Sequence, residues 1–185
     1  TGLGAGLILN GELYSGTNGM AGEAGHIRLA EDGPVGYGKE GSFEGFCSGG
    51  GIAQLGQVMA EEALDREEIP SFCQSKGELF KVNARTIAEA AEKGDPLALK
   101  IYDIVADRLG QGLAILVDLL NPEKIVIGSI FLRQEKLLRP RMEKILNKEA
   151  LGQSVSVVEV VPAGLGEKLG DYAAVSVGLR AYQKK

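Results

Sequence analysis

The opening stretch of the chain holds the residues best suited to chemistry. Glu23 and His26 lie three residues apart, and His26 is the only histidine in the sequence. Glycines precede and separate this pair, at positions 2, 4, 6, 11, 16, 19, 22 and 25. Glycine lets a backbone approach a ligand closely, while a carboxylate accepts hydrogen bonds and an imidazole donates or accepts them. The loop is therefore suited to reading a polyhydroxylated ligand, and the alternative is a surface loop with incidental charges.

The composition fits one soluble globular domain. The 185 residues suffice for a sizeable core, and 44% of them are hydrophobic and 24% charged. A net charge of −5 argues against a surface for phosphate backbones, and no apolar run is long enough to span a bilayer. Cys47 and Cys73 are too few for a disulfide scaffold and lack the paired spacing of a metal site. We therefore expect free buried thiols and a cytoplasmic protein.

The first quarter of the chain predicts a hairpin followed by a long loop. Asn10-Gly11 between apolar runs is a type I′ turn signal, which places strands over 3–9 and 12–15. Residues 16–46 are rich in glycine and polar residues and show little periodicity. A loop of this length in a compact domain is usually functional.

The rest of the chain alternates helices with short apolar strands. Helices are predicted over 48–64, 84–93, 96–120, 135–146 and 171–182, and strands over 124–128 and 155–161. Ser48, Asn83 and Asp95 are the expected N-caps. Gly110 and Gly112 inside one helix suggest close packing of its backbone against a sheet. The alternation indicates an α/β architecture.

Several spaced motifs, taken in order, resemble those of one protein family. The motifs are T-G-L-G-A-G at 1–6, E-A-G-H at 23–26, N-P-E-K-I-V-I-G at 121–128, V-P-A at 161–163 and L-G at 165–166. With them the chain resembles the ROK family of repressors, open reading frames and sugar kinases along nearly its whole length. The resemblance implies the actin-like, ribonuclease-H-like ATPase fold, here an α/β lobe with a mixed sheet flanked by helices.

The resemblance implies a sugar site in the glycine-rich loop. Glu23, His26 and Glu44 match residues that hydrogen-bond sugar hydroxyls in the family's sugar-binding members. Their chemistry suits this role, because carboxylates accept hydrogen bonds from vicinal diols and imidazole both donates and accepts.

A nucleotide site is implied at two further places. The hydroxyl and the backbone amides of Thr1, Gly2 and Gly4 would hold phosphate, although a glycine-rich strand start at a hairpin looks the same. Gly128 and Ser129 follow a buried strand and would contact adenosine. An ordinary strand-to-helix turn is the alternative there, and Ser129 departs from the glycines that the family carries after Ile-Gly.

The loop after the histidine departs further from the family pattern. Most members carry C-x-C-G-x-x-G-C-x-E, whose cysteines hold a structural zinc together with the histidine. In this chain Val35, Tyr37 and Ser42 stand at the cysteine positions. Valine offers no donor atom, and one histidine cannot complete a tetrahedral zinc site. We therefore expect the loop without the metal.

The resemblance implies that residues 1–185 are the C-terminal lobe of a two-lobed, ATP-dependent sugar kinase. Family kinases carry the catalytic aspartate in an N-terminal lobe, so this lobe has no catalytic residue and should be inactive alone. The expected reaction transfers a phosphoryl group from Mg²⁺-ATP to a hexose such as glucose or fructose, or to a β-glucoside. The expected assembly is a homodimer that binds a small-molecule sugar, with neither nucleic acid nor membrane as a partner of this lobe.

Two alternatives to the kinase remain open. One is the effector lobe of a sugar-responsive ROK repressor, which would have the same sugar loop without turnover. The other is a non-catalytic module that binds sugar or oligomerises. The residues before Thr1 distinguish the first two classes, because a phosphate loop with N-D-x-N marks a kinase and a helix-turn-helix marks a repressor.

The purified chain should contain no tightly bound zinc, because Val35, Tyr37 and Ser42 supply no thiolate. Metal analysis by mass spectrometry after dialysis should find far less than one zinc ion per chain. A stoichiometric zinc ion that survives dialysis would overturn this expectation.

Overall fold

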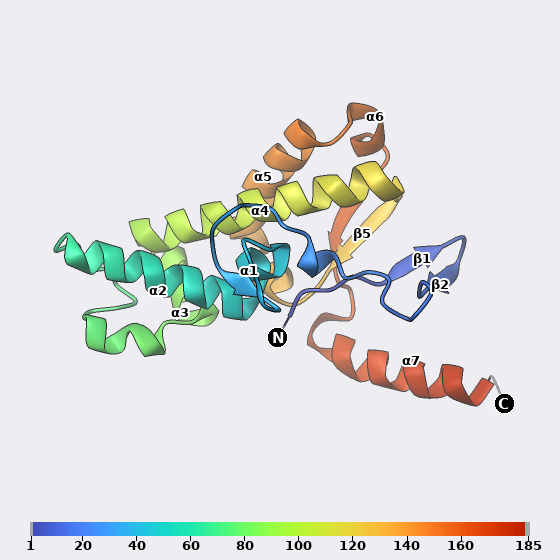
Figure 1. Cartoon of the computed structure of the whole chain (residues 1–185), viewed down its shortest axis with the longest axis horizontal. Coiled ribbons are helices and arrows are strands. Elements are labelled where there is room, and N and C mark those ends of the chain that lie inside the picture. The colour runs from blue at the N-terminus through green and yellow to red at the C-terminus, as the bar shows by residue number, and fades with distance from the viewer. Residues whose placement is uncertain (1, 184–185) are drawn as a thin grey trace.

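The computed structural model describes residues 2–183, without the side chains of residues 167, 169, 177 and 180–183 (Figure 1). The α-helices are α1 (Phe43–Cys47), α2 (Gly49–Asp65), α3 (Ala84–Glu92), α4 (Pro96–Leu120), α5 (Ile130–Glu149), α6 (Gly152–Val155) and α7 (Leu169–Gln183). Short 3₁₀ turns are η1 (Ala24–His26), η2 (Lys76–Lys81) and η3 (Gly166–Lys168). No described helix combines the length and the apolar character needed to cross a membrane.

The strands of the described residues form three separate pairs. β1 (Leu7–Leu9) and β2 (Glu12–Tyr14) are antiparallel, as are β3 (Val35–Gly36) and β4 (Lys39–Glu40). β5 (Lys124–Ile127) and β6 (Glu159–Pro162) are parallel. Mixed helices and strands confirm the α/β class. A single mixed sheet is not formed within residues 2–183, where each pair stands alone.

Helix α4 is the centre of the packing. Asp95 caps it by accepting a hydrogen bond from the Ala98 amide at 2.9 Å, and Pro96 occupies the first helical turn, where a missing N–H leaves no bond unmade. The helix ends at Asn121, whose φ of 43° is left-handed. Figure 1 shows α1, α2 and α3 on one side of α4 and α5 along another. The cap, the proline and the stop are those predicted from the sequence.

The core is a layer of helix-to-helix contacts around α4. Its most deeply buried large side chains are Tyr102, Ile52, Ile87, Ile101, Leu138, Met142, Val105 and Val117. They come from α2, α3, α4 and α5, so helices far apart in the chain share one apolar cluster. Burial of this kind is the main source of stability in a domain of this size.

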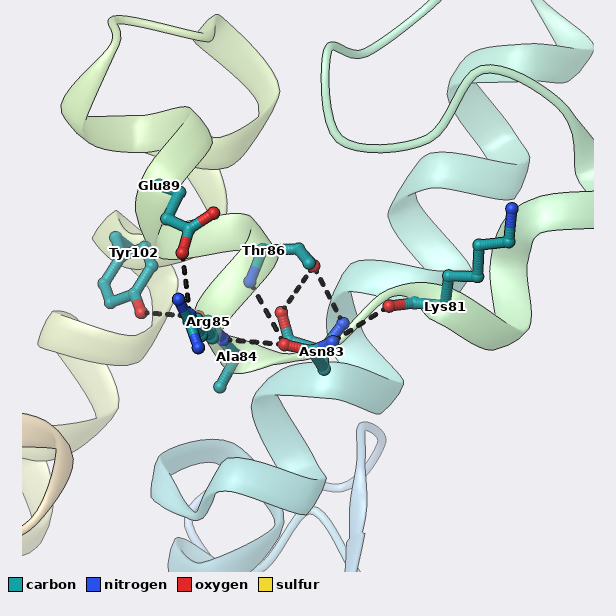
Figure 2. Close-up of polar contacts among 7 residues, drawn as sticks. All are labelled: Lys81, Asn83, Ala84, Arg85, Thr86, Glu89 and Tyr102. Atoms are coloured by element: carbon teal, nitrogen blue, oxygen red, sulfur yellow. Dashed lines mark hydrogen bonds and ion pairs between the residues drawn. The ribbon is translucent and has the colours of Figure 1, made fainter.

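Helix α3 begins with a reciprocal cap, drawn in Figure 2. The side-chain oxygen of Asn83 accepts hydrogen bonds from the amides of Arg85 (3.0 Å) and Thr86 (3.1 Å), and the Thr86 hydroxyl accepts from the Asn83 amide at 3.0 Å. Tyr102 of α4 donates its hydroxyl to the Ala84 carbonyl at 3.2 Å, which ties the start of α3 to the central helix (Figure 2). Burial raises the pKa of Tyr102 to about 12.

The predicted hairpin at Asn10-Gly11 is confirmed, since both residues have positive φ (53° and 80°) as a type I′ turn requires. The strand predicted over 3–9 is limited to β1, because only its last three residues pair with β2. The strand predicted over 155–161 is wrong at its start. Residues 152–155 are helical, and β6 begins at Glu159 because β5 offers only four residues to pair with.

Cys47 and Cys73 are free thiols, as predicted. The Cys73 sulfur is buried and donates to the Ser75 carbonyl at 3.4 Å, and the half-buried Cys47 donates to the Val105 carbonyl at 3.7 Å. Burial raises the pKa of both thiols, so neither is poised to act as a thiolate.

One end of the molecule exposes apolar side chains on two elements. The β1–β2 hairpin leaves Ile8 64% exposed, and α7 leaves Val175 61% exposed, together with Leu13, Tyr172 and Leu179. Figure 1 shows both elements at the end of the molecule opposite α2 and α3.

The two glycines of α4 allow close approach, but not to a sheet. A Cβ at Gly110 would lie 2.7 Å from both the Met142 carbonyl oxygen and the Ile145 Cβ, which belong to α5. A Cβ at Gly112 would overlap the ring of Phe43 in α1. The prediction of close backbone packing was correct, but the predicted partner, a sheet, was wrong. A glycine in a helix indicates a close contact but does not identify the element on the other side.

Gly110→Ala should therefore destabilise the protein by about 1–3 kcal/mol, since α4 and α5 must separate to admit the methyl group. This loss opposes the gain of about 1 kcal/mol that alanine gives a helix interior. Gly50→Ala is the matched control, because Gly50 is in α2 with open space beside it. Urea unfolding should show the control unchanged or slightly more stable. Equal stability of the two variants would contradict the contact.

Candidate functional site

The Glu23–His26 motif forms a tight 3₁₀ turn. The His26 amide donates to the Glu23 carbonyl at 3.1 Å, and the Ile27 amide donates to the Ala24 carbonyl at 3.0 Å. Ala24 and Gly25 in the middle are buried, whereas Glu23 and His26 at the ends are exposed. The turn therefore presents a carboxylate and an imidazole to solvent from a backbone held by the body of the protein.

The glycine-rich start of the chain lies directly against this turn. The Ala5 amide donates to the Gly22 carbonyl at 2.7 Å. A Cβ at Gly22 would overlap the Ala5 carbonyl, and a Cβ at Gly25 would overlap the Leu3 carbonyl. Only glycine at 22 and 25 permits this approach, and Gly22 also has a φ of 94°. The phosphate motif and the sugar motif proposed from the sequence are thus in backbone contact.

Glu44 joins the same place from helix α1. Its Oε2 atom accepts a hydrogen bond from the Leu3 amide at 2.9 Å. A Cβ at Gly25 would lie 3.2 Å from the Glu44 Cβ, and a Cβ at Gly36 would lie 2.7 Å from it. Helix α1 is fixed beneath by Ser42, a fully buried residue whose Oγ accepts from the Gly45 amide at 3.0 Å. The carboxylate is therefore held between the phosphate motif and the histidine turn.

The β3–β4 hairpin completes the neighbourhood of the histidine. Tyr37 and Gly38 form its tip with positive φ values of 46° and 75°. The Tyr37 ring meets the His26 ring edge-on, with centroids 6.2 Å apart and an interplanar angle of 81°. Lys39 Nζ donates to the His26 carbonyl at 2.8 Å. In the sequence, Tyr37 was notable only because it stands where the family has a cysteine. The Tyr37-Gly38 dipeptide could have predicted the hairpin turn, because glycine is favoured at such turns.

Hydrogen bonds from side chains to the backbone secure this hairpin. Gln54 of α2 bonds Val35 twice, accepting from its amide and donating to its carbonyl, each at 3.0 Å. Arg28 donates to the Glu40 carbonyl at 2.8 Å, and Ser42 donates to the Gly36 carbonyl at 3.4 Å. The loop therefore has a defined conformation set by ordinary side chains.

The donor set around His26 does not fit a zinc ion. Within the described residues, no group of three or more His, Cys, Asp and Glu side chains is arranged to hold a metal. Val35 contributes only backbone atoms to the hydrogen bonds of the loop, and the Ser42 hydroxyl is engaged by Gly36 and Gly45. Tetrahedral zinc needs four ligands of the thiolate, imidazole or carboxylate kind, and this loop offers one imidazole.

The nucleotide residues expected from the sequence fall into two groups in the structure. Thr1 lies outside the described residues. Gly2 and Gly4 are exposed and belong to the segment against the histidine turn, and a Cβ at Gly4 would meet open space. Gly128 and Ser129 follow β5 and precede α5, and no hydrogen bond among the described residues joins them to Glu23, His26 or Glu44.

Ser129 has an unusual backbone for its residue type. Its φ of 56° and ψ of −119° place a serine where glycine is favoured, and its side chain makes no capping bond to α5. Such a conformation costs on the order of 1–3 kcal/mol for a residue with a Cβ. The glycines that the family carries after Ile-Gly would adopt this conformation without strain. Ser129 adopts the same conformation at the cost given above.

The fold is shared with a solved structure that contains bound ligands. The structure is similar to a ROK family glucokinase from Streptomyces griseus in complex with glucose and AMPPNP, with a TM-score of 0.73 and 28% identity. The similarity covers 91% of this chain and 54% of that chain. The ROK family model matches residues 1–177. The chain therefore belongs to the ROK family, which confirms the resemblance seen in its motifs.

Curated relatives include both regulators and kinases. The chain is 33% identical over 179 residues to the DNA-binding transcriptional dual regulator NagC of Escherichia coli K12, covering 94% of this chain and 41% of the relative. It is 34% identical over 173 residues to a glucokinase of Halalkalibacterium halodurans, covering 92% of this chain and 51% of the relative. The chain thus spans about half the length of these relatives.

Gln54→Ala should loosen the β3–β4 hairpin, because the Val35 amide and carbonyl lose their partners and each lost bond contributes about 1 kcal/mol. Amide hydrogen exchange over residues 34–41 should become about tenfold faster or more. Gln57→Ala is the control, since Gln57 lies three residues on in α2 and bonds Val82 instead. Equal exchange of the hairpin in both variants would show that Gln54 does not secure it.

Proposed function

We propose that the full-length protein is an ATP-dependent sugar kinase in which residues 1–185 form the C-terminal lobe. The observation that carries this proposal is the contact between the glycine-rich segment at Leu3–Ala5 and the Gly22–Gly25 backbone, joined through Glu44. Phosphoryl transfer needs the terminal phosphate and the acceptor hydroxyl side by side and in line. A phosphate site abutting a sugar site supplies that arrangement.

In this proposal Glu23, His26 and Glu44 bind the sugar hydroxyls. Glu23 and His26 are exposed and make no side-chain hydrogen bond within the described residues, so both are free to bind a ligand. Glu44 Oε2 is occupied by the Leu3 amide, which leaves its other oxygen to accept from a hydroxyl. A shared carboxylate of this kind would couple the position of the sugar to the phosphate segment.

The phosphates would contact Thr1, Gly2 and Gly4, and adenosine would contact Gly128 and Ser129. Gly2, Gly4 and Gly6 are exposed while Leu3 and Ala5 are half-buried. A Cβ at Gly4 or Gly6 would meet open space, whereas one at Gly2 would lie 2.6 Å from Glu44 Oε2. Backbone without side chains can approach phosphate oxygens closely. Mg²⁺ bound to ATP would neutralise charge on the phosphates. The substrate is a hexose such as glucose or fructose, or a β-glucoside.

The remainder of the protein would supply a second lobe. The chain spans 41% of NagC and 51% of the Halalkalibacterium halodurans glucokinase, and some of its exposed apolar side chains lie on the hairpin β1–β2 and on α7. We propose that an N-terminal lobe covers them and carries the catalytic aspartate, which completes the ribonuclease-H-like arrangement with its mixed sheet. This lobe alone would then be inactive. A cytoplasmic homodimer is the assembly that the family resemblance favours.

The second candidate is the effector lobe of a sugar-responsive repressor. The 33% identity to NagC, close to the 34% identity to the glucokinase, favours it as much as the kinase. The sugar residues would be the same, and a DNA-binding segment would lie outside residues 1–185, consistent with the net charge of −5 of this chain. Sequencing the gene upstream of Thr1 separates the two classes.

In the full-length protein, Glu23→Gln should lower kcat/KM for the sugar about tenfold or more. The substitution keeps the size of the side chain and removes a charged hydrogen bond that contributes on the order of 1.5–3 kcal/mol. His26→Ala should act in the same direction, while the KM for ATP changes little. A coupled assay measures both parameters.

Glu62→Gln is the control, because Glu62 is an exposed carboxylate of α2 away from the site. The placement of the catalytic aspartate in an N-terminal lobe fails if the 185-residue chain alone turns over sugar and ATP above background. The kinase assignment fails if the full-length protein phosphorylates no sugar. The sugar site fails if stably folded Glu23→Gln and His26→Ala variants keep the kinetics of the parent.

A further inference from the structure

The imidazole of His26 is restrained by one neighbour. Neither ring nitrogen has a hydrogen-bond partner within the described residues, and the side chain is exposed. The ring contact that the structure shows is with Tyr37, edge-on, at 6.2 Å between centroids. An edge-to-face pair at this separation is attractive and defines the mutual orientation of the two rings. The orientation of the imidazole therefore depends on where Tyr37 is held.

Tyr37 is held by the hairpin and not by burial. Its side chain is 85% exposed, so packing against the core does not place it. Its backbone has a φ of 46° at the tip of the β3–β4 hairpin, a conformation that side-chain-bearing residues seldom adopt. Gln54 and Arg28 fix the two strands of that hairpin by the hydrogen bonds described above. A residue with a side chain at such a φ is an outlier from which a functional role can be hypothesised.

A second bond ties the hairpin to the histidine itself. Lys39 follows the tip and donates to the carbonyl of His26 at 2.8 Å. The hairpin thus contacts His26 twice, once at its backbone through Lys39 and once at its ring through Tyr37. Through these two contacts, the position of the hairpin tip and the position of the imidazole depend on each other.

We propose that Tyr37 is a positioning residue for His26, whose ring sets the plane of the imidazole and leaves both ring nitrogens free for sugar hydroxyls. The inference rests on the proposed sugar role of His26. Tyr37 stands at a position where the family resemblance implies a zinc-binding cysteine, and the donor set here does not fit that ion. In this chain an aromatic contact takes the place of a metal bond in orienting the histidine.

The position offers a matched pair of variants. Tyr37→Phe keeps the ring and removes only the hydroxyl. Tyr37→Asn removes the ring but suits the backbone, because Asn tolerates positive φ and Asn-Gly is the preferred type I′ turn. The hairpin should therefore fold in both variants, and any difference between them reports the ring. Circular dichroism and thermal unfolding of both variants check that the fold is retained.

The first measurement is the proton NMR signal of the His26 ring, which needs no assignment because the 185-residue chain has a single histidine. The ring current of Tyr37 displaces this signal from its position in an unstructured peptide. Tyr37→Phe should leave the signal in place, and Tyr37→Asn should move it toward the unstructured position. A Tyr37→Asn signal that coincides with that of the parent overturns the proposal.

The second measurement is sugar binding, followed by the same signal during titration with D-glucose, D-fructose and N-acetyl-D-glucosamine. The sugar that moves the signal in the parent chain should bind about three- to tenfold more weakly to Tyr37→Asn, the range expected for loss of an aromatic pair. Binding to Tyr37→Phe should match that of the parent. In the full-length enzyme the same loss should raise the KM for sugar and leave kcat and the KM for ATP unchanged.

The outcomes separate this inference from the proposed function. Equal sugar affinity of the parent and Tyr37→Asn overturns the positioning role and leaves the sugar site intact. A parent signal that none of the three sugars moves overturns the sugar role of His26, and the positioning role with it. A raised KM with an equal fall in kcat in both variants would mark a general loss of structure and would also contradict the proposal.

Discussion

The candidate site depends on backbone segments that approach one another with no side chain between them. Gly22 and Gly25 lie against the carbonyls of Ala5 and Leu3, and Gly45 lies against the Pro34 carbonyl. Gly51 at the start of α2 lies in turn against the Gly45 carbonyl. A methyl group at any of these places would overlap main-chain atoms, so space requires glycine at each of them, and at Gly22 the φ of 94° requires it as well. Every functional side chain in the site is carried by one of these segments or by a neighbour of one.

This stack of backbone is anchored to the helical core through α1. Phe43 is 2% exposed and its ring rests on Gly112 of α4. Phe46 of the same short helix lies beneath Arg108 of α4, whose guanidinium carbon is 4.9 Å from the ring centroid. The central helix thus carries the apolar core on one side and the floor of the site on another. The Glu44 carboxylate on α1 is therefore held in place by the packing against α4, which would suit its proposed role in binding a ligand.

The loop around the histidine is held by hydrogen bonds from side chains to the main chain. A bound zinc ion would fix several side chains by strong bonds at one point. Here Gln54, Arg28 and Lys39 supply weaker bonds to main-chain atoms at separate points along the loop. The conformation then depends on α2, which carries Gln54, and the histidine can keep both ring nitrogens for a ligand. Loss of one such bond should loosen the loop without dismantling it, whereas loss of a metal removes all its bonds together.

The sequence by itself determined the local features and the family. The turn at Asn10-Gly11, the caps at Ser48 and Asn83 and the start of α4 at Asp95 depend on neighbours within a few residues, so short patterns predicted them. The motifs that contain Glu23 and His26 likewise identified the ROK family. The sugar role of those residues stays a prediction.

Only the tertiary structure decided which distant segments meet. The length of β6 depended on its partner strand, and the neighbour of Gly110 proved to be α5 in place of a sheet. Neither the motif at 23–26 nor the loop at 35–44 predicted the contact of Tyr37 with His26. That contact depends on a hairpin whose position is fixed by Gln54 of α2. Contacts of this kind arise from packing between segments far apart in the chain, and a linear pattern records the close approach but not its partner.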